Sequence, residues 1–368
     1  MRKSYLATIH GASTLLLCLR QADAFSAASP SSISTADSSS NQRQRPNPNC
    51  TENRGGRRRR SLALLTFDLD DTLFPCGPVV AEANEAMIAS IVAHGYPTVT
   101  NADVLAATKA IRNDLRQAAD DNNAPITYTD LRIAAIQSQL QKSLEERFPH
   151  LGLDRGGGAL PHESVSRKIF RVWLAARHEA AERNLYPGAV DMLRRIRADH
   201  PGAVIGAVTN GRGDPLDMRR TLRPFFDFTV SGEDADVFPH RKPQPGIYEV
   251  TLDRFESVAG YDLRPELGRE QDGRQDGRGC WVHVGDDLAN DVGASAACGA
   301  KAVWYDMDDE EGEGEKEEGT TPFYSTASAE EIERRKRMAA QAEALVTERI
   351  STLAQLPTAI ENILSDRG

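Results

Sequence analysis

The sequence predicts an α/β fold, a doubly wound parallel (Rossmann-like) sheet with a block of helices inserted as a second domain. Beyond residue 61, short apolar runs alternate with segments of helical periodicity. The runs are rich in Val, Ile and Ala and lack clean alternation of apolar and polar residues, which is typical of parallel strands buried on both faces. Helical crossovers between such strands give the doubly wound arrangement.

The expected elements follow in order along the chain. Strands are predicted over residues 62–67, 203–208, 226–231, 281–284 and 300–304. Helices between them include residues 188–199 and 291–298. Right-handed crossovers place the carboxyl ends of the strands at one edge of the sheet, where ligands bind in folds of this class.

Residues 78–185 interrupt this alternation with a pattern that is almost wholly helical. Apolar residues recur at helical spacing on two faces, Val80, Ala83, Met87 and Ile91 on one and Ile133, Ile136, Leu140, Leu144 and Phe148 on the other. One crossover needs only about a dozen residues, so we interpret the block as a helical domain over the strand edge. Residues 61–77 and 186–368 then form the α/β core, with solvated insertions near 264–279 and 306–319.

Composition excludes several classes of partner. The net charge of −10 argues against a main body that binds nucleic acid. The five cysteines are scattered, without the paired spacing of a zinc site or a disulfide framework. Nothing after residue 61 approaches about 18 uninterrupted apolar residues, so no membrane span is expected in the mature protein. No pattern sets the oligomeric state.

The first 60 residues differ from the rest and predict a targeting leader outside the fold. A basic start precedes an apolar stretch around residues 15–19, and Ala-Asp-Ala follows at 22–24, which is the order of a secretory signal. The Ser-rich continuation and its junction at Phe25 resemble the bipartite plastid-targeting leaders of algae with secondary plastids. We therefore predict import into a plastid, with secretion or a cytoplasmic location as the alternatives.

Three aspartates crowd the end of the first expected strand. In LLTFDLDDTL, residues 64–73, Asp68, Asp70 and Asp71 follow an apolar run. A carboxylate at a strand tip can attack an electrophile, and one two residues later can transfer the proton of the leaving group. Such a cluster is tolerable only with a cation among the charges. Mg²⁺, a hard ion that prefers oxygen ligands, is the expected cofactor.

Further polar residues follow later strands. GAVTNG places Thr209 and Asn210 where a hydroxyl and backbone N–H groups can hold phosphoryl oxygens. RKPQPGIY brings Lys242 to a helix start, where its ammonium can neutralise both nucleophile and phosphate. VHVGDDLANDVGAS adds Asp286 at a strand tip and Asp291 at the start of the next helix. The sequence therefore predicts a phosphoryl-transfer site at one edge of the sheet.

In residue type, order and spacing, these four segments resemble the motifs of the haloacid dehalogenase superfamily, across roughly residues 62–305. The resemblance implies that Asp68 attacks phosphorus and forms an aspartyl-phosphate. It implies that Asp70 protonates the leaving alcohol and then activates the hydrolytic water. No chemistry is assigned to Asp71 beyond capping or orienting the loop, which Thr72 would steady.

The same resemblance implies the remaining site residues. Mg²⁺ would bind the carboxylates of Asp68 and Asp286 and the backbone carbonyl of Asp70, with Asp291 bound directly or through water. The transferring phosphoryl group would be held by Thr209, Asn210 and Lys242.

An acid at Asp70 favours phosphate transfer, because dehalogenases lack one there and a halide leaves without a proton. The helical insert resembles the C1-type cap of the superfamily, which closes over small phosphorylated metabolites. The predicted function is a magnesium-dependent phosphatase for a small-molecule phosphate ester. A phosphomutase and a noncatalytic, regulatory binding protein stay as alternatives.

One branch of the superfamily resembles the chain more closely. ALLTFDLDDTLF, YTDLRIAAI and AVTNGRGDP are similar to phosphatases that act on flavin mononucleotide and the ribityl-aminouracil phosphate of riboflavin biosynthesis. Tyr128 and Arg132 lie one helical turn apart and could stack on and hydrogen-bond a flat, polar group. The alternative is that Tyr128 packs into the helical domain while Arg132 is a solvated surface charge.

Overall fold

The computed structural model describes residues 60–117, 126–151, 163–271, 279–307 and 327–365. Six parallel strands form one sheet in the order β3-β2-β1-β4-β5-β6. Their bounds are β1 (Ser61–Phe67), β2 (Val204–Thr209), β3 (Phe228–Ser231), β4 (Gly279–Gly285), β5 (Lys301–Tyr305) and β6 (Val346–Ile350). The predicted doubly wound parallel sheet is confirmed. The edge strand β6 was not among the expected strands.

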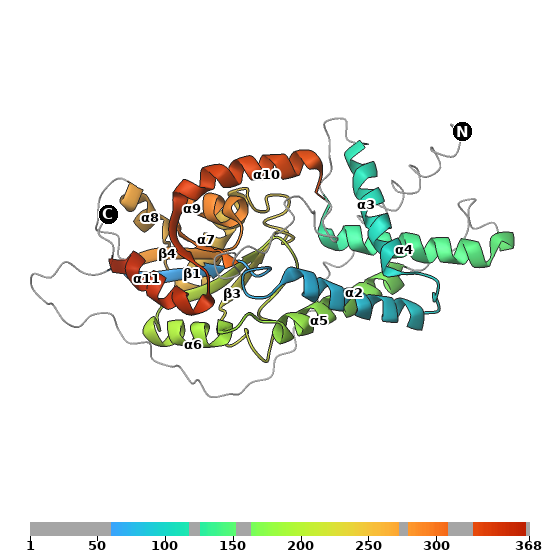
Figure 1. The fold of residues 1–368 in the computed structure, drawn as a ribbon, viewed down its shortest axis with the longest axis horizontal. Coiled ribbons are helices and arrows are strands. Elements are labelled where there is room, and N and C mark those ends of the chain that lie inside the picture. The colour runs from blue at the N-terminus through green and yellow to red at the C-terminus, as the bar shows by residue number, and fades with distance from the viewer. Residues whose placement is uncertain (1–59, 118–125, 152–162, 272–278, 308–326, 366–368) are drawn as a thin grey trace, which may run out of the picture. The chain divides into compact units, whose positions relative to one another are not determined.

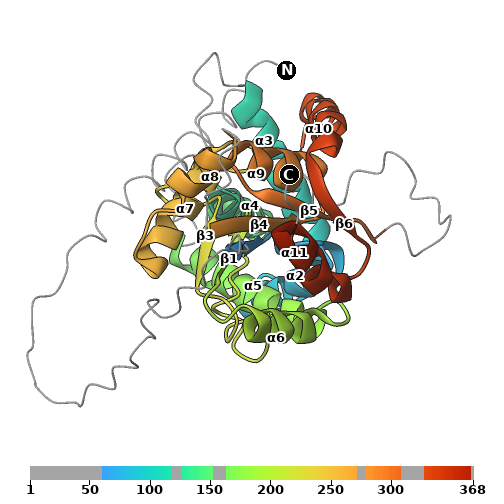
Figure 2. The same ribbon diagram turned by 90° about the vertical axis from the view of Figure 1, so that its left-hand side faces the viewer.

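Helices cover both faces of the sheet (Figures 1 and 2). One face buries its apolar side chains against α6 (Ala189–Asp199) and α11 (Leu356–Ser365). The other packs on α7 (Gly246–Ala259), α8 (Arg264–Gln271) and α9 (Ala294–Ala297). Along β1, Leu65 and Phe67 belong to the first core and Leu64 to the second, so the strand is largely apolar because both of its faces are buried.

Short helical segments complete the core. Leu288–Gly293 forms a π-helical turn, η3, that leads into α9. The helix expected at 291–298 therefore begins earlier and is irregular. After β5 the chain continues through α10 (Ala329–Ala342), the turn η5 (Glu343–Leu345), β6 and the turn η6 (Leu353–Gln355) before α11.

The prediction of a loop at 264–279 is wrong in its first half, because residues 264–271 form helix α8. Leu263 and Leu267 lie one turn apart and are buried in the core beneath this helix. Burial of these two leucines stabilises the helix despite the polar residues around them. The second half, 272–278, lies outside the described residues, as do most of the insertion at 306–319 and the leader up to residue 59.

A helical cap follows β1. It consists of α2 (Cys76–Ala93), α3 (Asn101–Gln117), α4 (Tyr128–Arg147), a short turn η1 (Pro149–Leu151) and α5 (Glu163–Arg183). Figure 1 shows α2 beside α5 and α3 beside α4. The expected face of α2 is buried at Val80, Ala83, Met87 and Ile91. The side chain of Thr127 accepts a hydrogen bond from the N–H of Asp130 and so caps the start of α4.

Among the described residues, α2 is the one helix long and apolar enough to cross a membrane by length and composition. Its apolar face packs on α5 inside the cap, and the core helix of a globular domain passes the same test. The absence of a membrane span in the mature protein stays a prediction.

Candidate active site

The ends of neighbouring strands bring the predicted carboxylates together. Asp68 directly follows β1, and its N–H donates to the carbonyl of Val284 at 2.9 Å, which continues the ladder to β4. Asp71 then turns the chain, with a positive φ of 60°. Its carboxylate accepts a hydrogen bond from the N–H of Cys76 at 2.8 Å, at the start of α2. Asp71 thus orients the loop, as expected.

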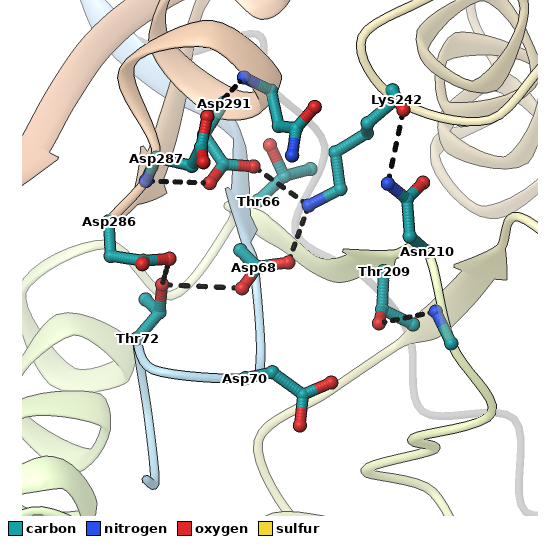
Figure 3. A network of polar contacts seen from close by, with 12 residues as sticks. Thr66, Asp68, Asp70, Thr72, Thr209, Asn210, Lys242, Asp286, Asp287 and Asp291 are labelled. Carbon is teal, nitrogen blue, oxygen red and sulfur yellow. Dashed lines mark hydrogen bonds and ion pairs between the residues drawn. The ribbon is translucent and has the colours of Figure 1, made fainter. Parts of the chain in front are cut away.

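Lys242 joins two of these carboxylates in a buried cluster (Figure 3). Its Nζ donates to Oδ1 of Asp68 at 2.5 Å and to Oδ1 of Asp291 at 2.7 Å. Burial alone would lower the pKa of Lys242, but Asp291 and Asp68 together raise it. Lys242 is therefore a fixed positive charge beside the predicted nucleophile.

The negative charges of the cluster are compensated unequally. Burial raises the pKa of Asp68 to about 8, against the opposing effect of Lys242. Burial and the nearby Asp291 and Asp68 raise the pKa of Asp286 well above its ordinary range. Asp291 differs, because Lys242 and His283 outweigh its burial and lower its pKa. Among these three carboxylates, Asp68 and Asp286 lack a sufficient positive partner.

These features fit a divalent cation. One oxygen from each of Asp68, Asp286 and Asp291 lies within 4.8 Å of the others. The hydroxyl of Thr72 lies between two of them, 3.4 Å from Oδ2 of Asp68 and 3.3 Å from Oδ1 of Asp286. A hard cation with oxygen ligands would neutralise the uncompensated charge.

Thr209 and Asn210 end β2 beside this cluster, as the sequence predicts. The Thr209 hydroxyl accepts from the N–H of Gly211 at 3.2 Å, which leaves its own proton for another acceptor. Asn210 donates through Nδ2 to the carbonyl of Lys242 at 3.1 Å. The side chain of Asn210 thus fixes the segment that carries the lysine.

Asp70 lies apart from the cluster in Figure 3 and pairs with an arginine of the cap. Nη2 of Arg177, on α5, contacts both carboxylate oxygens of Asp70 at 2.6 and 2.7 Å. Arg177 is only 4% exposed, and a Cβ at Gly213 would lie 2.7 Å from its Nη1. The guanidinium of Arg177 therefore packs closely against the core loop at Gly213.

Sequence reasoning missed Arg177. One signal was present, because Phe170, Trp173, Arg177 and Ala181 share one face of α5, so the arginine interrupts an apolar stripe. Its partner lies 107 residues away in the sequence, and only the packing of α5 reveals it.

Tyr128 and Arg132 both line the cavity above Asp68, and each contacts a different aromatic or charged partner. The Arg132 guanidinium stacks on the Trp173 ring, 3.9 Å from its centroid, and donates to Oδ1 of Asn84 at 3.2 Å. Tyr128 is 39% exposed and lies beside Arg241, 4.4 Å from its ring centroid. The alternative, with Tyr128 packed and Arg132 solvated, is also wrong, because Tyr128 is exposed and Arg132 stacks on Trp173.

The cavity has a volume of about 1630 Å³ and separates the strand ends from the cap. Its cap wall carries four arginines and, among the described lining residues, no carboxylate: Arg112, Arg116, Arg132 and Arg177. Two of these reach core carboxylates, Arg177 at Asp70 and Arg116 at Glu331. The wall opposite the aspartates is therefore positively charged and suits an anionic ligand.

The chain is similar to one protein family and to several solved structures. The family model described as haloacid dehalogenase-like hydrolase matches residues 62–299. A solved 2-haloacid dehalogenase from Pseudomonas syringae pv. Tomato DC3000 is similar, with 21% identity, a TM-score of 0.49, and coverage of 82% of this chain and 99% of that chain. A magnesium-bound HAD-hydrolase from Bacillus subtilis has 17% identity, a TM-score of 0.41, and coverage of 82% and 100%. A HAD phosphatase from Thermococcus onnurineus has 17% identity, a TM-score of 0.40, and coverage of 81% and 98%. No curated protein is significantly similar to the sequence.

Proposed function

Because the chain belongs to the haloacid dehalogenase-like hydrolases, we propose that it is a magnesium-dependent phosphatase that acts on a small phosphorylated metabolite. One observation carries the proposal. The carboxylates of Asp68, Asp286 and Asp291 lie together with a single lysine, Lys242, between two of them, so negative charge is in excess, and a further carboxylate, Asp70, lines the same cavity. Phosphoryl transfer uses a nucleophile, a cation and a proton donor, whereas the loss of a halide needs no donor.

In the proposed reaction, Asp68 attacks the phosphorus and the ester oxygen leaves, which gives an aspartyl-phosphate and an alcohol. Asp70 gives its proton to the leaving oxygen. It then takes a proton from the water that attacks the acyl phosphate, so that inorganic phosphate is released and Asp68 is regenerated. Arg177 holds the Asp70 carboxylate at the cavity wall.

The other residues of the site neutralise negative charge and keep the reacting groups in place. Mg²⁺ would bind Asp68, the Asp70 carbonyl and Asp286, with Asp291 close by, and when bound it neutralises the phosphoryl oxygens. Lys242 supplies a second positive charge at Oδ1 of Asp68. The Thr209 hydroxyl can donate to a phosphoryl oxygen, while Asn210 keeps Lys242 in place.

The helical cap, proposed to span residues 78–185, would select the substrate. Its arginines attract anionic esters, and the cavity volume of about 1630 Å³ has room for a nucleotide-sized molecule. The motif resemblance makes flavin mononucleotide and the ribityl-aminouracil phosphate the first candidates. The exposed ring of Tyr128 offers a surface on which a flat group could stack.

Release of inorganic phosphate from a metabolite panel tests the proposal. Activity should require Mg²⁺ and disappear in Asp68→Asn, which keeps the shape of the side chain but cannot form the acyl phosphate. A sugar phosphate isomerised without phosphate release would identify a phosphomutase. Binding without turnover of any ester would favour the noncatalytic alternative.

A second experiment tests the flavin candidates. Arg132→Ala should raise KM for flavin mononucleotide more than for an aryl phosphate too small to reach α4. Arg147→Ala is the matched control, since Arg147 is an exposed residue of the same helix outside the cavity lining. Equal changes for both esters would remove Arg132 from substrate recognition.

A further inference from the structure

A buried chain of hydrogen bonds connects the interior of the sheet to the active site. Thr66 on β1 and His283 on β4 are paired in register, and their side chains meet with Oγ1 and Nδ1 2.8 Å apart. Trp281 donates from Nε1 to the same Oγ1 at 2.8 Å. On its other side, His283 lies with Nε2 3.5 Å from Oδ1 of Asp291. All four side chains are buried. Of the four, only Asp291 has a role in the mechanism above.

The direction of hydrogen donation along this chain follows from chemistry. An indole N–H can only donate, so the Thr66 oxygen accepts from Trp281 and its hydroxyl proton can go to Nδ1 of His283. A neutral imidazole that accepts at Nδ1 carries its proton on Nε2. The other tautomer would set a lone pair of Nε2 against the Asp291 carboxylate. His283 therefore donates to Asp291.

Asp291 is thereby supplied with donors on both oxygens. Oδ1 accepts from Lys242 and His283, and Oδ2 accepts from the N–H of Asp287 at 3.1 Å. The carboxylate also packs against the end of β4, where a Cβ at Gly285 would lie 2.3 Å from its Cγ. The position of Asp291 is therefore fixed by protein contacts.

Asp286 has the opposite character. Among the described residues, one donor contacts its carboxylate, the Thr72 hydroxyl at 3.3 Å, which also lies 3.4 Å from Asp68. A carboxylate has about four acceptor sites. Most of those on Asp286 are available to a cation, whereas three on Asp291 are already used.

We propose that Thr66 and His283 are positioning residues that hold Asp291, and that Asp291 orients Lys242 on the nucleophile without ligating the cation directly. The inference rests on the proposed function for its kinetic part. It resolves the two possible roles of Asp291 in favour of contact through water. Lys242 is then held from both sides, by Asp291 and by Asp68, so that its charge stays beside the attacking carboxylate.

Mn²⁺ binding tests the role of Asp291 without any turnover. Free Mn²⁺ is measured by electron paramagnetic resonance in titrations of the full-length protein, Asp286→Asn and Asp291→Asn. Both changes remove one negative charge and preserve side-chain shape. Asp286→Asn is expected to weaken Mn²⁺ binding at least about tenfold more than Asp291→Asn, because only the former loses a direct ligand. Equal losses would overturn the proposal.

Kinetics test the positioning residues. His283→Leu should lower kcat about tenfold, with KM changed less than about threefold, since the substrate does not contact it. His283→Gln can place an amide N–H near the Nε2 position and should recover most of kcat. A purely structural role predicts no such recovery. Equal loss in both variants, or full activity in His283→Leu, would contradict the inference.

Thr66→Val tests the same positioning role independently if His283→Leu does not fold. It preserves shape while removing the hydroxyl, so it should lower kcat in the same direction as His283→Leu with unchanged Mn²⁺ affinity. If no phosphate ester is hydrolysed, the proposed function fails, and the Mn²⁺ comparison still decides the role of Asp291. If esters are hydrolysed but Thr66→Val and His283→Leu match the wild type, only the positioning proposal fails.

Discussion

Replacing the proposed nucleophile should stabilise the metal-free protein. Asp68→Asn removes a charge that is buried beside Asp286 and Asp291, while Lys242 keeps its contact with Asp291. In the unfolded chain Asp68 has its ordinary pKa of 3.8, and burial raises the folded value to about 8. Between these values the folded state binds more protons than the unfolded state, so the free energy of unfolding falls as pH rises.

The size of the effect follows from this difference in pKa. A rise from 3.8 to about 8 corresponds to an upper bound of about 6 kcal/mol, at about 1.4 kcal/mol for each pH unit. Water entering the metal-free site and movement of Lys242 reduce this bound, because buried groups respond as if in a medium of dielectric constant near 20. We therefore expect Asp68→Asn to gain about 1–3 kcal/mol at pH 8, and less at pH 6.

The assay is urea-induced unfolding in EDTA at pH 6 and pH 8. Burial lowers the pKa of His178 and His283, so their titration makes the free energy of unfolding rise with pH below about pH 7, opposite to the effect of Asp68. The wild type and Asp68→Asn must therefore be compared at each pH. Asp191→Asn is the control, because this exposed carboxylate on α6 should change stability little. Saturating Mg²⁺ should close the gap, since the wild type alone has a complete ligand set. A wild type more stable than Asp68→Asn at pH 8 in EDTA would refute the reasoning.

Four further changes test separate parts of the protein. Asp70→Asn should slow esters of ordinary alcohols far more than an activated aryl phosphate, which needs little protonation; equal losses in kcat would remove Asp70 from proton transfer. EDTA should stop hydrolysis, and Asp286→Ala should raise the Mg²⁺ concentration for half-maximal rate; full activity in EDTA would contradict the metal site. Arg177→Gln should lower the free energy of unfolding by about 1–3 kcal/mol, because it leaves the partly buried Asp70 without its cation; an unchanged denaturation midpoint would show that the pair contributes nothing. A reporter fused to residues 1–60 should enter the plastid of an alga with secondary plastids, and changing Phe25 should divert it to the secretory route; a cytosolic reporter would exclude the leader.

The strands were predictable where both faces are buried. β1 and β2 lie within two residues of the segments expected at 62–67 and 203–208. Their apolar runs follow directly from burial between two layers of helices. The edge strand β6 was not expected, because its sequence VTERI places charged Glu348 and Arg349 in the strand and gives no apolar run. In the same way, α8 depends on two buried leucines that a polar composition concealed.

The cap illustrates a different limit. Tyr128 and Arg132 are one turn apart on α4, as their spacing requires, yet they contact different partners. Arg132 is held by Trp173 of α5, whereas Tyr128 meets Arg241 of the core. Helical periodicity fixes which residues share a face, and the neighbouring elements decide what that face meets.

The sequence by itself determined the parallel sheet and the convergence of Asp68, Thr209 and Asp286 at one edge. Each ends or directly follows a strand, and parallel strands end on the same side of the sheet, so their meeting needs only local pattern and strand order. Only the tertiary structure placed Arg177 on Asp70 and His283 beneath Asp291. The first contact depends on how α5 packs against the core. The second depends on how the π-helical turn η3 places Asp291 over the end of β4, and neither leaves a periodic signal in the chain.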